Sequence, residues 1–352
     1  MKILPEEYID LLKNLIATPS FSKEEDKTAQ LIHDFLAKKS IEIQRIQNNI
    51  IARNKYFDNK KKTILLNSHH DTVKPNASWK KDPFTPIVED GKLYGLGSND
   101  AGGPLVSLMA TFVHFYNQRD LKYNLIFAAT AEEEISGKNG IELMLPILSE
   151  IDFAIVGEPT NLQMAVAEKG LMVLDCIAKG KSGHAAREEG ENAIYKAMKD
   201  IGWFKGYRFD EQSKILGDIK MSVTMINAGT QHNVVPDECR FVVDVRSTDA
   251  YTNEEILDII RENVDCEVTA RSTRLQPSGL PEEHILWKCT HDLNIRTFGS
   301  PTLSDQALMP FSSVKIGPGD SARSHTADEY IKTREIKNGI DLYINLLKKL
   351  LI

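Results

Sequence analysis

The sequence has few cysteines and no evident export or membrane segment. Four cysteines occur in 352 residues, and none of them form a Cys-x-x-Cys pair. This scarcity argues against a disulfide framework and a thiolate zinc site, so we expect reduced, mostly buried thiols. The first residues lack the apolar core of a signal peptide, and no apolar run approaches the ~18 residues of a membrane helix. We therefore expect a cytoplasmic protein without a membrane partner.

Basic residues are also fewer than acidic ones. The chain has 43 Lys and Arg against 50 Asp and Glu, which gives a net charge of −7. Proteins that bind nucleic acid normally carry a basic face, so we expect no nucleic-acid partner. There is no internal repeat and no low-complexity tract. The 41% of hydrophobic residues is ordinary for a globular protein, and the length of 352 residues favours two domains.

Hydrophobic periodicity predicts an α/β fold made of two domains. Buried strands of a mixed, mostly parallel sheet are expected near 41–46, 49–54, 63–69, 123–131, 152–156 and 313–316. Helices are expected at 5–17, 104–117, 283–293 and 334–351, and another after a capping box formed by Ser22 and Glu25.

The pattern changes after residue 169. Strands near 170–179, 221–228, 240–247 and 267–274 and helices near 192–204 and 254–263 follow the order βαββαβ, which is the ferredoxin-like arrangement. We predict a first domain formed by residues 1–168 and 282–352, with residues 169–281 inserted as a second domain. A small four-stranded sheet of this kind exposes an edge that a two-fold partner can extend, so a homodimer through the inserted domain is expected.

Polar residues follow several of the predicted buried strands. The run at 63–68 stops at His69-His70-Asp71, where residues at i and i+2 share one face of an extended segment. His69 could therefore bind a metal with Asp71 close by, although a polar strand end without chemistry is the alternative. Ligands of α/β proteins collect at the carboxyl ends of the strands, which makes this position a candidate site.

Acidic residues occupy the other strand ends. The glycine-dense stretch 93–103 carries Asp100 before a helix, and it lacks the Gly-Lys-Ser/Thr of a phosphate-binding loop, so a plain turn is the alternative. Glu132-Glu133-Glu134 ends the strand at 123–131 and would be repulsive without a nearby cation, unless the triplet is a solvated turn. Glu158 follows the strand at 152–156, and His325 lies in a loop after 313–316.

Together these positions offer two imidazoles and three carboxylates, namely His69, Asp100, Glu134, Glu158 and His325. Mixed nitrogen and oxygen ligands without thiolates suit Zn²⁺, Co²⁺ or Mn²⁺ in a catalytic site. Five ligands with a central carboxylate could hold two metals that share a water and polarise a carbonyl, as amide hydrolysis requires. Glu133 would then be placed to take the proton from that water.

Five motifs resemble, in order and approximate spacing, the co-catalytic zinc deacylases and exopeptidases of the M20 family: His69-His70-Asp71, Gly97-Ser98-Asn99-Asp100, Glu132-Glu133-Glu134, Gly157-Glu158-Pro159 and Ser324-His325-Thr326. The resemblance extends over nearly the whole chain. It implies a zinc-exopeptidase-like catalytic domain with an inserted lid and dimerisation domain.

The resemblance also implies a role for each matching residue. His69 and Glu158 would bind one divalent metal, Glu134 and His325 would bind the other, and Asp100 would bridge the two. Zn²⁺ is expected in both positions, with Co²⁺ as the alternative. Asp71 would orient His69, and Glu133 would serve as general base and acid.

Further matches concern the inserted domain and a glycine loop. Residues 180–186 resemble the family's lid motif, in which His184 would stabilise the oxyanion, often from the partner subunit; a capped turn is its structural alternative. Asn233 would approach the substrate and Arg246 would clamp its carboxylate, unless Arg246 only pairs with Asp244. Gly319, in the loop before His325, is a further substrate-binding candidate.

The implied activity is removal of the acyl group from an N-acyl amino acid, a small-molecule substrate. N-acetylornithine deacetylation in arginine biosynthesis is the first expectation. N-acetylcitrulline, an N-succinyl amino acid such as succinyl-diaminopimelate, and a dipeptide are the alternatives. The chain departs from the family pattern at residues 101–104 and at Glu132, where aspartate is common, and its modest length suggests shortened loops around the pocket. A metal-dependent binding protein without turnover is the hypothesis from another class.

Overall fold

The protein is described by a computed structural model that covers residues 3–148 and 150–352. It consists of two compact units. Unit 1 comprises Met1–Val166, Leu280–Phe298 and Ser304–Ile352, and unit 2 comprises Ala167–Gly279 and Gly299–Leu303. The main segment of unit 2, residues 167–279, differs by two residues at each end from the inserted domain expected at 169–281. Unit 2 also includes residues 299–303, for which the sequence showed no pattern. Within the described ranges, no helix is both long and apolar enough to cross a membrane.

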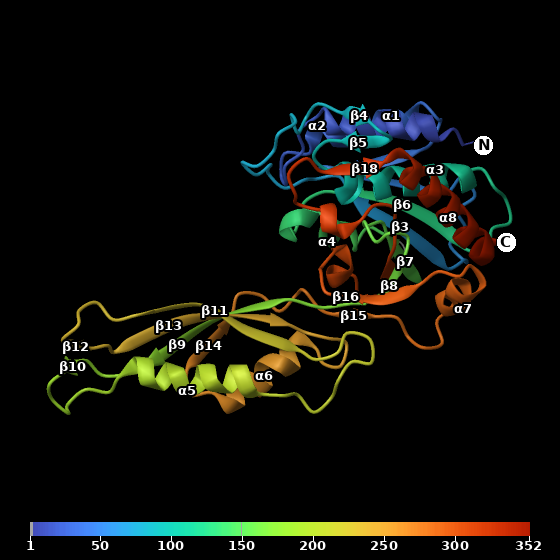
Figure 1. Cartoon of the computed structure of the whole chain (residues 1–352). Coiled ribbons are helices and arrows are strands. Elements are labelled where there is room, and N and C mark those ends of the chain that lie inside the picture. Colours follow the sequence, from blue (N-terminus) through green and yellow to red (C-terminus); the bar gives the residue numbers. More distant parts are fainter. Residues whose placement is uncertain (1–2, 149) are drawn as a thin grey trace. The chain divides into compact units, whose positions relative to one another are not determined.

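Unit 1 is built on a mixed sheet with the strand order β1-β2-β6-β3-β7-β17-β8, of which β3, β6, β7 and β8 are labelled in Figure 1. Its strands are β1 (Ile43–Ile46), β2 (Asn49–Arg53), β3 (Thr63–His69), β6 (Asn124–Thr130), β7 (Phe153–Val156), β8 (Met164–Glu168) and β17 (Ser312–Lys315). The short strands β15 (Ser278–Gly279) and β16 (Thr297–Ser300) pair with β8. A separate antiparallel sheet contains β4 (Ile87–Glu89), β5 (Lys92–Tyr94) and β18 (Tyr330–Lys332).

The helices of unit 1 are α1 (Pro5–Ile16), α2 (Asp26–Ala37), α3 (Gly103–Phe115), α4 (Ile141–Met144), α7 (Ile285–Asp292) and α8 (Thr333–Leu351). Short helical turns occur at Ser98–Gly102, Glu133–Ile135, Asp305–Leu308 and Ser321–Arg323.

The sheet of unit 1 is buried on both faces. All seven residues of β3 and all seven of β6 are buried, and these strands pair in parallel. Ile64 and Leu66 join a core cluster with α1, α3 and α8, whereas Leu65 joins a second cluster with α4 on the other face. This two-sided burial explains why the strands read as continuous apolar runs. Because β3, β6, β7 and β17 are parallel, their carboxyl ends meet at one edge of the sheet.

Unit 2 has the predicted ferredoxin-like order. It contains β9 (Met172–Lys179), α5 (Ala193–Gly206), β11 (Lys220–Ala228), β13 (Glu238–Arg246), α6 (Asn253–Asn263) and β14 (Glu267–Ala270). The sheet order β11-β13-β9-β14 is antiparallel throughout, and residues of α5 and α6 form one core cluster with it. A capping box of Thr252 and Glu255 starts α6. The last strand ends at Ala270, four positions short of the expected Arg274. A separate two-stranded sheet contains β10 (Gly183–His184) and β12 (Val234–Val235).

The capping box predicted for Ser22 and Glu25 is wrong. Helix α2 begins at Asp26 and its N-cap residue, Glu25, makes no side-chain capping bond. The Ser22 hydroxyl instead donates to Asp71 at 2.7 Å, and the Glu25 carboxylate accepts from the backbone N–H of Glu132 at 3.2 Å. Both side chains therefore support the end of the sheet where the polar residues gather.

Candidate metal centre

The predicted metal-binding residues of unit 1 come from five segments at the carboxyl edge of the sheet. His69 is the last residue of β3, Glu134 lies in the turn after β6, and Glu158 follows β7. Asp100 lies in the Ser98–Gly102 turn before α3, and His325 follows the short turn Ser321–Arg323. The peptide bond between Asp100 and Ala101 is cis.

His69 faces three carboxylates. Its Nε2 atom lies 3.4 Å from Asp100 Oδ1, 3.7 Å from Glu133 Oε2 and 3.8 Å from Glu158 Oε1. His325 faces a second set, with its Nε2 atom 2.9 Å from Glu134 Oε2 and 3.6 Å from Asp100 Oδ2. Asp100 therefore turns one carboxylate oxygen toward each imidazole, which is the arrangement of a carboxylate between two cation positions.

The donor set fits a divalent metal. The ligand atoms of His69, Asp100 and Glu134 lie within 4.8 Å of one another. His69 Nδ1 is 3.0 Å from the carbonyl oxygen of Asp71, so Nδ1–H is the natural donor and Nε2 keeps its lone pair. That Nε2 atom is buried and has no hydrogen-bond partner among the described residues. A ring nitrogen directed at carboxylate oxygens calls for a cation between them, a proton in the metal-free protein or a metal when one is bound.

Electrostatics support the same conclusion. Burial raises the pKa of Glu133 well above its ordinary value, and burial also raises the pKa of Glu134. Burial alone would lower the pKa of His69, but Glu133, Asp100 and Asp71 raise it well above the usual range. The hydrogen bond to Glu134 raises the pKa of His325 to about 9. The metal-free cluster thus holds protons that a bound cation would displace.

Asp71 supports the centre in a way that the sequence did not reveal. Its Oδ1 atom accepts from the backbone N–H of Glu133 at 3.1 Å, and its Oδ2 atom accepts from that of Glu134 at 3.2 Å. Oδ1 also lies 3.4 Å from His69 Nδ1. Asp71 therefore orients His69 mainly through its carbonyl oxygen and fixes the acidic turn through its carboxylate. His70 points away, with its ring nitrogens at Thr28 and the Asn48 carbonyl.

Two buried acids near the centre had no recognisable pattern in the sequence. Glu329 accepts hydrogen bonds from the backbone N–H groups of Gly97, Asn99 and Asp100, and burial raises its pKa to about 8. Asp305 accepts from the Thr130 hydroxyl at 2.7 Å, and burial raises its pKa to about 6. Both lie far along the chain from their partners, so no local spacing could have indicated them.

Gly319 has a clear structural task. Its φ of +92° favours glycine, and a Cβ atom there would lie 2.5 Å from Asn99 Oδ1. Asn99 is buried, and its side-chain amide pairs with both the N–H and the carbonyl of Asp320. The glycine thus lets the loop before His325 approach the Asp100 turn closely.

The three candidates expected in the inserted domain belong to unit 2. His184 is exposed in β10, and its ring accepts from the backbone N–H of Ala186 at 3.1 Å, as in the turn alternative. The carbonyl of Asn233 accepts from the N–H of Ala185. Arg246 pairs with Asp244 through two bonds of 2.9 and 3.2 Å, so the alternative of a strand pair is present.

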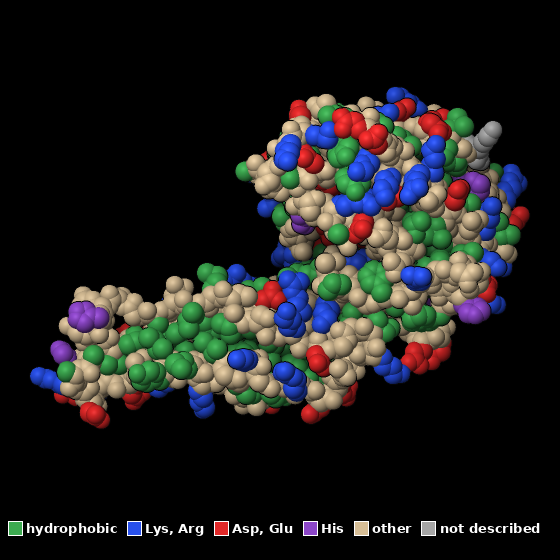
Figure 2. All heavy atoms as spheres, in the orientation of Figure 1, with side chains coloured by type: hydrophobic (Ala, Val, Ile, Leu, Met, Phe, Trp, Pro, Cys, Tyr) green, Lys and Arg blue, Asp and Glu red, His purple; other side chains and the backbone are tan. Residues whose placement is uncertain are grey.

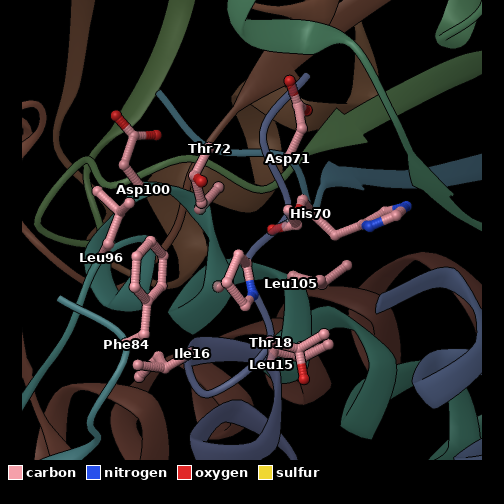
Figure 3. Close-up of a pocket in the computed structure, with 15 residues that line it drawn as sticks. Leu15, Ile16, Thr18, His70, Asp71, Thr72, Phe84, Leu96, Asp100 and Leu105 are labelled. Atoms are coloured by element: carbon pink, nitrogen blue, oxygen red, sulfur yellow. The ribbon is translucent and has the colours of Figure 1, made fainter. Parts of the chain in front are cut away.

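A small cavity borders the centre on the side of α1 and α3. Figure 3 shows Asp71 and Asp100 at one end of it and the apolar side chains of Ile16 and Phe84 at the other. Its volume of about 20 Å³ admits about one water molecule. The cavity is therefore too small for a substrate group.

Comparisons with known proteins agree with this geometry. Residues 65–349 match the model of peptidase family M20/M25/M40. An acetylornithine deacetylase of Proteus mirabilis (strain HI4320) is 29% identical, covering 94% of this chain and 93% of the relative. A succinyl-diaminopimelate desuccinylase of Orientia tsutsugamushi (strain Ikeda) is 26% identical, covering 73% of this chain and 71% of the relative.

Two solved structures share the fold. Aminopeptidase PepT from Bacillus cereus superposes with a TM-score of 0.79 at 18% identity, covering 99% of both chains. The Bacillus subtilis YXEP protein, a dinuclear metal-binding peptidase of family M20, superposes with a TM-score of 0.74 at 16% identity, covering 99% of this chain and 98% of that one.

Proposed function

Because this chain belongs to peptidase family M20/M25/M40 and is a hydrolase of amide bonds, we propose that it removes the acyl group from N-acyl amino acids. The single observation that carries the proposal is the position of Asp100, whose two carboxylate oxygens face His69 and His325 at 3.4 and 3.6 Å. A carboxylate between two imidazoles, with acids on either side, suits a pair of divalent metals.

We assign the ligands by proximity. His69 and Glu158 would hold one metal and Glu134 and His325 the other, with Asp100 shared. Zn²⁺ is the first candidate and Co²⁺ the second. Glu133 lies as near to His69 Nε2 as Glu158 does, at 3.7 against 3.8 Å, so distance alone does not separate these two acids. We give the ligand role to Glu158 and the proton-transfer role to Glu133 because Gly157-Glu158-Pro159 and Glu132-Glu133-Glu134 resemble the family motifs that carry these roles.

A metal pair would supply Lewis-acid polarisation of the scissile carbonyl and of the attacking water. Glu133 would accept the proton of that water and donate it to the leaving amine, because its carboxylate lies 3.7 Å from the Nε2 atom of the ligand candidate His69. Asp71 would keep the Glu133-Glu134 turn in place. His184 would stabilise the oxyanion, Arg246 would bind the substrate carboxylate with its guanidinium held by Asp244, and Asn233 and Gly319 would line the substrate site.

The substrate that we propose first is N-acetylornithine, which the protein would hydrolyse in the cytoplasm as part of arginine biosynthesis. This choice is supported by the likeness to acetylornithine deacetylase over 94% of the chain, and the four free cysteines agree with a reducing compartment. N-acetylcitrulline, N-succinyl amino acids and dipeptides remain the alternatives. The likeness to a succinyl-diaminopimelate desuccinylase supports the succinylated compounds among these alternatives.

We also propose a homodimer through unit 2. Hydrophobic side chains gather along this unit in Figure 2. Tyr195 and Met198 of α5 and Met225 and Ile226 of β11 are each more than half exposed, and β11 is an edge strand. An apolar helix face beside an open strand edge suits a second copy of the same surface.

The decisive experiment is Glu133→Gln, assayed with the zinc- or cobalt-loaded protein on the acetyl and succinyl substrates. We expect kcat to fall by about 10²- to 10⁴-fold, the usual contribution of a general base, while both metals stay bound. A binding protein without turnover would show no hydrolysis in the wild type and no change in ligand affinity in the variant. The ratio of kcat/KM for N-acetylornithine and N-acetylcitrulline would then identify the side chain that the pocket prefers.

A further inference from the structure

Glu329 is a buried acid that the proposed reaction does not use. Its side chain is 2% exposed and lies just before β18, four residues after His325. Its Oε1 atom accepts from the backbone N–H of Asn99 at 2.8 Å and of Asp100 at 3.0 Å, and its Oε2 atom accepts from that of Gly97 at 3.2 Å. One carboxylate thus binds three N–H groups of the turn that carries Asp100.

The turn needs such a partner because its own backbone cannot supply one. Gly97 has a φ of +73°, and Asp100 has extended dihedral angles of −116° and 101°, so regular helical bonding is interrupted there. Buried N–H groups that lack a partner destabilise the structure, because they lose their hydrogen bonds to water without a replacement. The Glu329 carboxylate satisfies three of them at once and thereby sets the orientation of the peptide from which the Asp100 side chain projects.

The same short segment carries a metal-ligand candidate. His325 opens it, Asp328 accepts from the backbone N–H groups of Lys80 and Lys81 at 3.0 and 2.8 Å, and Glu329 closes it. Any shift of this segment therefore moves His325 and the support of Asp100 together. His325 Nε2 lies 3.6 Å from Asp100 Oδ2. Glu329 fixes the position of these two side chains relative to each other, because it is in the segment of His325 and binds the turn of Asp100.

We propose that Glu329 is the positioning residue that holds Asp100 in place between the two metals. The inference rests on the proposed function, since it assumes that Asp100 is the shared ligand. Glu329 itself does not touch the metals. Each metal position has two ligands besides Asp100, so a first metal can still bind through those and draw one Asp100 oxygen to itself. A second metal needs the other oxygen held toward it at the same time, so loss of Glu329 should weaken the second equivalent more than the first.

The test is a titration of the metal-free full-length protein with Co²⁺. Binding is monitored by calorimetry and by visible absorption, and the experiment needs no substrate. The variant Glu329→Gln keeps the shape but turns an amide NH₂ toward at least one backbone N–H. We expect one tight equivalent of Co²⁺ as in the wild type and a second equivalent weakened about 10- to 100-fold, the usual cost of losing an outer partner of a ligand. Excess Co²⁺ should restore the second equivalent.

Two further variants separate the reach of the side chain from the presence of a carboxyl group and from general stability. Glu329→Asp keeps the carboxyl group but is one methylene too short to reach all three N–H groups, so it should show the same selective loss. Asp328→Asn removes the neighbouring acid but keeps an Oδ1 acceptor for the backbone N–H groups of Lys80 and Lys81, so the segment stays in place and both equivalents should be unchanged.

Several outcomes would overturn the proposal. Wild-type affinity for both equivalents in Glu329→Gln would do so, as would full recovery in Glu329→Asp, which would show that the reach of the side chain does not matter. Equal weakening of both equivalents, or loss of the folded circular dichroism spectrum in both variants, would make Glu329 a residue of general stability. A wild-type protein that binds fewer than two Co²⁺ ions would instead refute the dinuclear proposal on which this inference rests.

Discussion

Asp71→Asn is the substitution that tests the support of the acidic turn most directly. The carboxylate of Asp71 accepts the N–H of Glu133 on one oxygen and the N–H of Glu134 on the other. An asparagine has the same shape but one acceptor oxygen. Whichever way its amide turns, one of these two N–H groups faces an NH₂ group.

The size of the effect follows from this mismatch. A buried donor without a partner costs about 1–3 kcal/mol, and a lost hydrogen bond to a charged group costs a similar amount. We expect the catalytic position of Glu133 to be disfavoured by about 2 to 4 kcal/mol, which corresponds to roughly 30- to 1,000-fold in kcat. Ser22→Ala is the matched control, because it removes only the hydroxyl that donates to the same carboxylate at 2.7 Å. Its effect on kcat should stay within about tenfold.

The assay compares kcat, KM and bound metal for both variants on the best substrate of the wild type. KM should change by less than about threefold, because the substrate contacts are unaffected. A kcat for Asp71→Asn within about threefold of the wild type would refute the reasoning. Equal losses of kcat in the two variants would also count against it, because Ser22→Ala leaves both backbone N–H bonds to the Asp71 carboxylate in place.

Two further predictions concern stability. Burial lowers the pKa of His70 to about 4, so the unfolded chain, with a histidine pKa near 6.5, binds the proton first as the pH falls. This stabilisation is complete above pH ~6.5 and is lost toward pH 4, in total about 3 kcal/mol. The free energy of unfolding of the metal-free protein, measured in urea, should therefore fall more steeply between pH 7 and 5 than that of His70→Gln. Parallel plots of this free energy against pH for the two proteins would contradict the assignment. Gly319→Ala should cost about 2–4 kcal/mol, since strain at positive φ adds to the clash with Asn99. Gly91→Ala, with a similar φ of +73° and open space around it, should lose only about 1–2 kcal/mol, and equal losses would exclude the clash.

The residues of the candidate site that could be predicted share one property. His69 ends a buried strand, and Glu134 and Glu158 each come shortly after one. The apolar runs of these strands are visible in the sequence, so the position of the strand end gives the position of the side chain. Parallel pairing then brings these ends to the same edge. The order of elements in unit 2 could be predicted for a similar reason, because alternation and helical periodicity are local signals.

The supporting interactions could not be predicted in this way. Glu329 binds backbone groups about 230 positions earlier, and Asp305 binds Thr130 at a separation of 175. Backbone N–H groups carry no sequence signature, so the partners of a buried acid are evident only once the chain is folded. The failed capping box shows the same limit, because the spacing of Ser22 and Glu25 fits a local role that tertiary contacts override.

The strand order of unit 1 has a consequence for the growing chain. Strand β17 pairs with β7 on one side and β8 on the other, yet it is synthesised after all of the residues from 167 to 279 that build unit 2. Until it leaves the ribosome, β7 and β8 each present an open edge, and neither His325 nor Glu329 exists. A nascent chain that stalls before Ser312 therefore leaves the edges of β7 and β8 unpaired and open to mispairing, and the residues from Ser312 onward complete both the sheet and the site.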